Sequence, residues 1–212
     1  MTDASVPPVP PVPFVLRPAR PSDAPAIAAL DSSFTTGTIY QVVAGEHGFT
    51  LRETPVDPPL RKVFPADGPD DEPEDDEPDD GPGRRPGDHA PDGGAGAGPG
   101  RTRTVVAEAD GALCGFVTAS FEPWNARLTV EDIEVAPGHR GRGVGRALME
   151  QAAAFGRECG AGQLWLEVSN VNVPAVRAYL RMGFTLCGLD VSLYENTASA
   201  GEQALFMRRG LR

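Results

Sequence analysis

The sequence predicts an α/β fold in which a mixed, mostly antiparallel sheet carries helices on its faces. Short apolar or alternating runs, typical of strands, occur both before and after two segments with helical periodicity. One strand-like run leads directly into a glycine-rich loop that opens a helix, within residues 135–148. The pair Asp110-Gly111 lies between two further strand-like runs and predicts an antiparallel hairpin.

Two segments of biased composition lie before and within the predicted domain. Residues 1–13 contain five prolines and lack the basic and apolar regions of a signal peptide, so we expect a disordered leader. Residues 67–80 are almost entirely Asp, Glu and Pro, and Gly/Pro-rich sequence continues to residue 100. Such composition cannot bury enough apolar surface to offset chain entropy. We therefore expect one domain over 14–212, interrupted by a disordered insert at about 65–100.

The net charge of −11 is concentrated in this insert. Residues 65–100 hold twelve acidic residues and two arginines, a net charge of −10, so the rest of the chain carries −1. Without a large basic face, nucleic-acid binding is not indicated. The insert is interpreted either as a solvated, tolerated insertion or as an electrostatic lure for cationic substrates.

Composition also predicts where the protein is located in the cell and whether it binds a metal. The three cysteines and three histidines are scattered, which predicts reduced thiols and no metal site. No apolar run is long enough to span a bilayer, so we expect a cytoplasmic protein that does not contact a membrane.

Before the insert, the pattern predicts one helix and three strands. A strand is expected at 14–17, and a helix begins at Pro21. The apolar face of that helix is expected to contain Ile27, Leu30 and Phe34. Alternating residues then predict strands at 38–43 and 49–53, around the turn glycines Gly45 and Gly48.

After the insert, the pattern predicts two helices among six strands. The expected strands cover 102–109, 113–121, 128–135, 164–168, 184–188 and 204–208. The first helix follows the glycine-rich loop, buries one face on the sheet and ends at Gly160 and Gly162. The second begins at Asn172, whose side chain can accept a backbone hydrogen bond, and ends at Met182-Gly183.

The glycine-rich loop predicts a phosphate or pyrophosphate site. Gly141, Gly143 and Gly145 let backbone N–H groups approach an anion at the positive end of a helix dipole, and Arg140, Arg142 and Arg146 add cationic donors. The loop lacks the Gly-Lys-Ser/Thr of a nucleotide P-loop. It also lacks the third glycine of a dinucleotide fingerprint, because Leu148 stands there.

The remaining pattern, Arg-x-x-Gly-x-Gly over 140–145, resembles the pyrophosphate loop of the GNAT superfamily of acetyl-CoA-dependent acetyltransferases. A second block, Asn-x-x-Ala-x-x-x-Tyr-x-x-x-Gly-Phe over 172–184, is similar to the GNAT segment that flanks the pantetheine and the thiol. The resemblance implies the GNAT fold and acetyl-CoA as co-substrate. The residues implied to contact the coenzyme are Ile133, Val135, Arg140, Gly141, Arg142, Gly143, Val144, Gly145 and Asn172.

Three residues are candidates for acid–base catalysis of acetyl transfer to an amine. Tyr179 is the candidate acid, because the resembling enzymes place a tyrosine there beside the sulfur. Glu167 and Glu131 remain alternative bases. Glu167 lies in an otherwise apolar strand, as in the similar segment of ribosomal-protein N-terminal acetyltransferases. Glu131 and Asp132 resemble an acidic pair of polyamine acetyltransferases, and strand alternation puts them on opposite faces.

Further segments are similar to streptothricin (nourseothricin) acetyltransferases of actinomycetes. These segments are 30–36, 48–53, 56–60, 124–125, 127–145, 164–172, 184–190 and 201–205. The resemblance implies acetylation of an amino group on the β-lysine portion of streptothricin, giving resistance. The implied partner is a small cationic amine, and the candidate substrate-binding residues are Asp31, Trp124 and Asp132.

Three other functions remain open at this stage. A protein N-terminal acetyltransferase would use the same Glu167 and Tyr179, and a polyamine acetyltransferase would favour Glu131 and Asp132. A non-catalytic acyl-CoA sensor would need none of these groups. Because GNAT folds often dimerise, a homodimer is an open alternative to a monomer.

Overall fold

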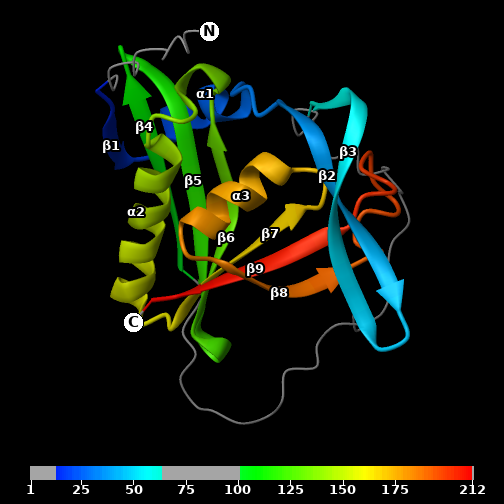
Figure 1. The fold of residues 1–212 in the computed structure, drawn as a ribbon. Helices are drawn as coiled ribbons and strands as arrows, with labels where there is room; N and C mark the ends of the chain where they lie inside the picture. Colours follow the sequence, from blue (N-terminus) through cyan, green and yellow to red (C-terminus); the bar gives the residue numbers. More distant parts are fainter. Residues whose placement is uncertain (1–12, 64–100, 212) are drawn as a thin grey trace, which may run out of the picture.

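A seven-stranded sheet forms the body of the protein, in the order β1-β4-β5-β6-β7-β9-β8 (Figure 1). The computed structural model describes residues 13–63 and 101–211. Within these ranges, β6 and β7 pair in parallel and the other neighbours pair antiparallel, which confirms the predicted mixed sheet. The strands are β1 (Val15–Pro18), β4 (Arg101–Ala109), β5 (Ala112–Glu122), β6 (Arg127–Val135), β7 (Gln163–Ser169), β8 (Thr185–Asp190) and β9 (Ala204–Gly210).

Two helices, α2 (Val144–Cys159) and α3 (Val173–Arg181), carry the main apolar faces that pack on this sheet. Helix α2 packs along β4, β5 and β6, and it ends at Gly160, whose φ of 82° is left-handed. The side chains that α2 buries are Val144, Leu148, Met149, Ala152, Ala153 and Phe155. The shorter helices are η1 (Pro21–Asp23), α1 (Ala24–Ala28), η2 (Pro123–Asn125) and η3 (Pro137–His139). In the described ranges, no helix is both long enough and apolar enough to cross a membrane.

The predicted turn between β4 and β5 is confirmed. Asp110 and Gly111 have φ angles of 52° and 79°. Two successive positive φ values match the right-handed twist of the flanking strands, which is why an Asp-Gly pair indicates a tight hairpin.

The first predicted helix is shorter than the periodicity suggested. Helix α1 ends at Ala28, and Phe34 belongs to the following strand, where it is buried. Between them, the Asp31 carboxylate accepts a hydrogen bond from the Ser33 backbone N–H at 2.9 Å. This local hydrogen bond favours a turn over a continued helix, so the prediction that Leu30 and Phe34 lie on the helix was wrong.

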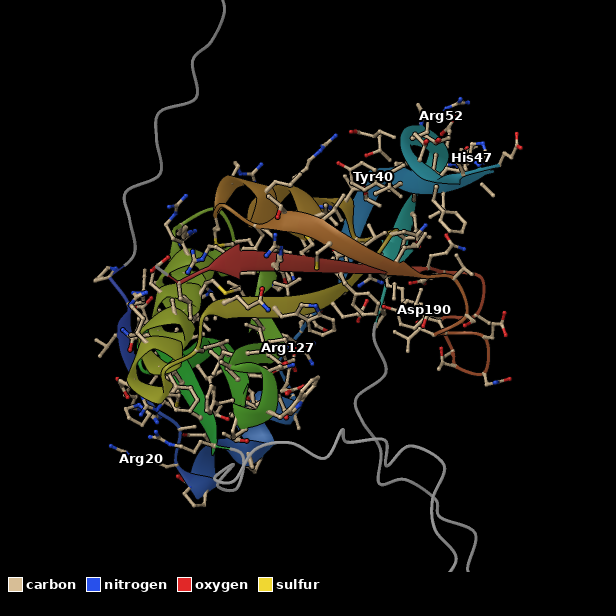
Figure 2. The ribbon with its side chains drawn as sticks, turned by 90° about the horizontal axis from the view of Figure 1, so that it is seen from below. Arg20, Tyr40, His47, Arg52, Arg127 and Asp190 are labelled. Carbon is tan, nitrogen blue, oxygen red and sulfur yellow. The ribbon has the colours of Figure 1, made fainter. Side chains whose placement is uncertain are left out.

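A separate two-stranded hairpin projects beside the main sheet. Its strands are β2 (Phe34–Gly45) and β3 (Gly48–Lys62), and both are longer than predicted. Figure 2 places His47 and Arg52 on the outer part of this hairpin, whereas Tyr40 lies nearer to the body. The Tyr40 backbone N–H donates to the Asn170 carbonyl at 2.9 Å, which ties the hairpin to the segment after β7.

The expected leader (1–13) and acidic insert (about 65–100) lie outside the described residues, apart from Pro13.

Candidate active site

A cleft opens where β6 and β7 part. The two strands pair in parallel from Arg127 and Gln163 as far as Val130 and Leu166, and each then continues with its other neighbour only. The first residues beyond the last pair are the two candidate bases, Glu131 and Glu167. An open cleft of about 1230 Å³ lies between the parted strands, α3 and the start of α2, and both glutamates line it.

A bulge places Glu131 at the mouth of this cleft. Thr118 of β5 pairs with Asp132 and the next residue pairs with Val130, so Glu131 has no partner in β5. Val130 is buried, whereas Glu131 and Asp132 are exposed. Because a bulge shifts the alternation of side chains by one residue, the simple alternation predicted for this strand does not hold across Glu131.

The loop end of the cleft comprises Gly141 to Gly145 and the N-terminus of α2. Gly141 and Gly143 have φ angles of 74° and 90°, which favour glycine. Gly143 is the N-cap residue, and no side chain caps the helix. The first N–H groups of α2 are therefore available to an anion, and the helix dipole favours negative charge there. This arrangement fits the predicted phosphate site.

Arg140 holds this loop in place. Its Nε donates to the Val135 carbonyl at 2.7 Å, and its Nη1 donates to the Ser33 carbonyl at 2.6 Å. Burial lowers the pKa of the Arg140 guanidinium, while the negative charges of Asp31 and Glu134 oppose that shift. With two donors engaged, Arg140 connects the end of β6 to the turn before β2, a structural role that the sequence pattern did not reveal.

The other residues predicted to bind the coenzyme divide into those that line the cleft and those that do not. Gly145, Ile133 and Val135 line the cleft together with Gly141 and Gly143. Val144 is fully buried under the loop, and Arg142 is half-buried outside the cleft lining. Arg146 does line the cleft, and its Nη2 donates to the Arg181 carbonyl at 3.3 Å.

Asn172 and Tyr179 reach the cleft from α3. As predicted, Asn172 is the N-cap residue, and its Oδ1 accepts from the Ala175 backbone N–H at 3.2 Å. Asn172 therefore keeps its amide nitrogen as the group that can donate to a ligand. Tyr179 lines the cleft about two helical turns later, with its ring 5.8 Å from that of Phe184. Burial raises the pKa of the Tyr179 phenol far above its ordinary value, and Asp132 and Glu167 raise it further.

Glu167 and Tyr179 form the acceptor end of the cleft, together with Glu131. Glu167 is half-buried, and the Tyr194 hydroxyl donates a hydrogen bond to its Oε1. Burial raises the pKa of the Glu167 carboxyl, the hydrogen bond from Tyr194 opposes this rise, and the charge of Glu202 adds to it. A carboxylate with a raised pKa and a protonated tyrosine in one cleft are a matched base and acid.

Five acidic side chains line the cleft, together with three arginines, Arg140, Arg146 and Arg181. The acidic residues are Asp31, Glu131, Asp132, Glu134 and Glu167. Hydrogen bonds from Ser33 hold the pKa of Asp31 below its usual value, which keeps it ionised. A cleft lined by carboxylates attracts cationic ligands.

Trp124 is not brought together with these residues. It lies in η2, before the first residue of β6, whereas the cleft opens at the other end of that strand. Its side chain is 72% exposed. Figure 2 labels Arg127, which marks this start of β6. Trp124 was predicted to bind substrate because its segment resembles the family. Similarity of a sequence segment does not show at which end of a strand that segment lies.

Sequence reasoning missed Tyr194, Ser33 and Ser169. Tyr194 and Ser169 line the cleft, and Ser33 accepts from Arg140 through its carbonyl. No local motif surrounds Tyr194, which stands 27 residues after its partner Glu167.

The family model described as the acetyltransferase (GNAT) family matches residues 64–184. This match covers both ends of the cleft, including the glycine loop, Glu167 and Tyr179. The chain therefore belongs to the acetyltransferase (GNAT) family, as the sequence motifs predicted.

Within that family, the similarity to streptothricin acetyltransferases extends over nearly the whole chain. The chain is 53% identical to the streptothricin acetyltransferase of Streptomyces lavendulae, over 92% of this chain and 93% of that protein. The crystal structure of a nourseothricin acetyltransferase has a TM-score of 0.76 and 55% identity, covering 94% of this chain and 99% of that one. A Bacillus anthracis protein crystallised with acetyl coenzyme A shares the fold (TM-score 0.68, 20% identity, 93% and 98% covered).

Proposed function

We propose that this protein transfers the acetyl group of acetyl-CoA to an amino group on the β-lysine portion of streptothricin-class antibiotics and thereby gives resistance. The observation that carries the proposal is a single cleft that joins an uncapped helix N-terminus to a half-buried carboxylate and a tyrosine. Similarity to streptothricin acetyltransferase over 92% of the chain supports the choice of acceptor. A cytoplasmic location is part of the proposal, and free Cys114, Cys159 and Cys187 fit a reducing compartment.

The loop end would hold the coenzyme. Backbone N–H groups at Gly143 to Gly145 would bind the pyrophosphate, and Arg142 and Arg146 would add positive charge nearby. The parted edge of β6 at Ile133 and Val135, and the amide of Asn172, would bind the pantetheine arm. When bound, acetyl-CoA supplies an activated thioester and a thiolate leaving group.

Residues at the acceptor end would remove a proton from the amine and donate one to the leaving sulfur. An amine with a pKa of about 10.4 is mostly protonated at neutral pH, so it must lose a proton before it attacks. Glu167 would accept that proton, because its raised pKa makes it a stronger base than an ordinary carboxylate. Tyr179 would donate its proton to the leaving sulfur. Glu131, exposed on the bulge, is the second candidate base, and Asp31 and Asp132 would bind the other amino groups of a polycationic substrate.

Polyamine acetylation is a second candidate function, because the same row of carboxylates suits a flexible polyamine. The deciding experiment measures CoA-thiol release from acetyl-CoA with streptothricin, spermidine and an N-terminal peptide at equal concentrations. We expect rapid release with streptothricin. Release with only the polyamine or the peptide would overturn the substrate assignment. No release with any of the three, together with tight acetyl-CoA binding by calorimetry, would favour a non-catalytic sensor.

A further inference from the structure

Tyr194 contacts the candidate base from outside the part of the chain that matches the family model. That match ends at residue 184, and Tyr194 lies in the connection between β8 and β9, residues 191–203. Its hydroxyl donates to Glu167 Oε1, and the tyrosine itself lines the cleft. One oxygen of the Glu167 carboxylate is therefore occupied by a fixed donor, so the other oxygen is the one that can face an acceptor amine.

A nearly buried ion pair between Lys62 and Glu202 also holds the connection that carries Tyr194. Glu202 accepts hydrogen bonds from Lys62 of β3 and from Ser169 at the end of β7. The side chains of Lys62 and Glu202 are only 14% and 15% exposed. Lys62 also donates to the Ser199 hydroxyl at 2.8 Å. Figure 1 shows this connection beside the β2–β3 hairpin, so two elements outside the family match contact each other here.

We propose that Tyr194 is a positioning residue for Glu167, held in place by the Lys62–Glu202 pair, and that it orients the carboxylate toward the acceptor amine. This inference rests on the proposed function of Glu167 as the base. Tyr194 keeps its own proton throughout, because burial and the adjacent Glu167 raise the pKa of its hydroxyl far above neutrality. It acts by donating a hydrogen bond to the charged form of Glu167.

The groups around Glu167 make opposite contributions to its titration. The hydrogen bond from Tyr194 stabilises the carboxylate and lowers the pKa of Glu167, whereas the negative charge of Glu202 raises it. Tyr179 faces Glu167 from α3. The carboxylates of β6 on the same cleft are those of Glu131, Asp132 and Glu134, and Lys62 of β3 is paired with Glu202. Removing the Tyr194 hydroxyl should therefore raise the pKa of Glu167, and neutralising Glu202 should lower it.

The first test is the dependence of kcat on pH for Y194F and E202Q. We expect the acidic limb of the profile to move up by about one pH unit in Y194F, since a hydrogen bond to a charged group is of that strength. In E202Q the acidic limb should move down: the glutamine amide can still hydrogen-bond to Lys62 and Ser169 and hold the connection in place, so mainly the negative charge is lost. Y40F is the matched control, because Tyr40 lies on β2 and its hydrogen bonds to Asn170 are made by its backbone, which the substitution keeps. Its profile should coincide with that of the wild type.

A purely structural role for Tyr194 would lower activity without moving these limbs in opposite directions. If the acidic limb of the pH profile stays in place in both Y194F and E202Q, the proposal is overturned. If Y194F fails to fold, E202Q still decides: a limb that stays in place or moves upward contradicts the proposed electrostatic arrangement.

The second test does not require turnover. The Glu167 carboxyl is followed by ¹³C NMR titration of glutamate-labelled protein, with E167Q assigning the resonance. A higher midpoint in Y194F than in the wild type supports the proposal, and equal midpoints overturn it. The two proposals can also fail separately. If the midpoint rises in Y194F but the wild-type protein does not release CoA with any of the three amines, the proposed function fails while the contact between Tyr194 and Glu167 stands.

Discussion

At the loop end of the cleft the backbone forms the candidate binding site, whereas at the acceptor end side chains from distant segments form it. Gly141 and Gly143 shape the loop through left-handed φ angles, and the helix N-terminus supplies the donors. Glu167, Tyr179 and Tyr194 meet at the acceptor end from β7, α3 and the β8–β9 connection. The backbone site at the loop end is determined by residues next to one another in sequence. The side-chain site at the acceptor end depends on how distant segments pack in the folded protein.

The largest effect should come from Glu167→Gln at the acceptor end. A base contributes about 10²–10⁴-fold to rate, so we expect kcat to fall by that range while acetyl-CoA affinity stays unchanged. Glu131→Gln is the matched variant and should lose far less. Steady-state kinetics decide between them, and the reverse order of effects would transfer the base role to Glu131.

The same variant also has a predicted effect on stability. Burial raises the pKa of Glu167 in the folded protein, so its contribution to stability is greatest below the unfolded pKa of about 4.3 and is lost as pH rises through the folded pKa. Glu167→Gln should therefore raise the Tm at pH 7 and change it little near pH 4. An unchanged or lower Tm at pH 7 would contradict the assigned cause of the shift.

Tyr179→Phe should have the next largest effect. We expect a fall in kcat of about 10²-fold, near the lower limit for general acid catalysis. A thiol with a pKa of about 8.5 is already a good leaving group and needs less help from a proton donor. Calorimetry should show normal acetyl-CoA binding. A kcat equal to that of the wild type would remove Tyr179 from the role of acid.

At the loop end, Gly143→Ala should weaken coenzyme binding without lowering kcat at saturation. A left-handed conformation costs an alanine about 1–2 kcal/mol, so distortion of the loop to relieve it should raise the Kd about tenfold. Gly138→Ala is the matched control: Gly138 lies in η3 just before the loop, has open space around an added Cβ and needs no left-handed φ. Equal affinities for both variants would mean that the loop conformation does not matter for binding.

The smallest effect separates the two roles of Asn172. Asn172→Ala removes the helix cap and should lower the stability of the protein by about 1 kcal/mol. Asn172→Ser keeps a capping oxygen but lacks the amide, so its Tm should stay near the wild-type value. If Asn172→Ser also binds acetyl-CoA normally, Asn172 serves as a cap and not as a coenzyme ligand.

The contrast between the two ends explains what could be predicted from the sequence. Tight turns and helix caps are local, so the Asp110-Gly111 turn and the Asn172 cap were assigned correctly from neighbouring residues. The bulge at Glu131 was not predicted, because it depends on the pairing of β6 with β5. Tyr194 and its partner Glu167 are separated by 27 residues, and Lys62 and Glu202 by 140, so no local pattern links them.

The hairpin shows a second limit of local reasoning. Pro55, Pro58 and Pro59 argue against a strand, since proline donates no ladder hydrogen bond. Strand β3 nevertheless continues to Lys62, because it belongs to a two-stranded sheet in which one side needs no donor. The register shift between Thr36 and Thr38 accommodates the extra residues of β3.

The parting of β6 and β7 also creates two strand edges that face each other inside one sheet. An outer edge exposes unpaired N–H and C=O groups to other chains, and proteins usually protect it with charges, proline or a covering element. Here α3 and the glycine loop line the gap between these edges. A narrow, extended ligand that enters the cleft would pair with those backbone groups and so complete both strands.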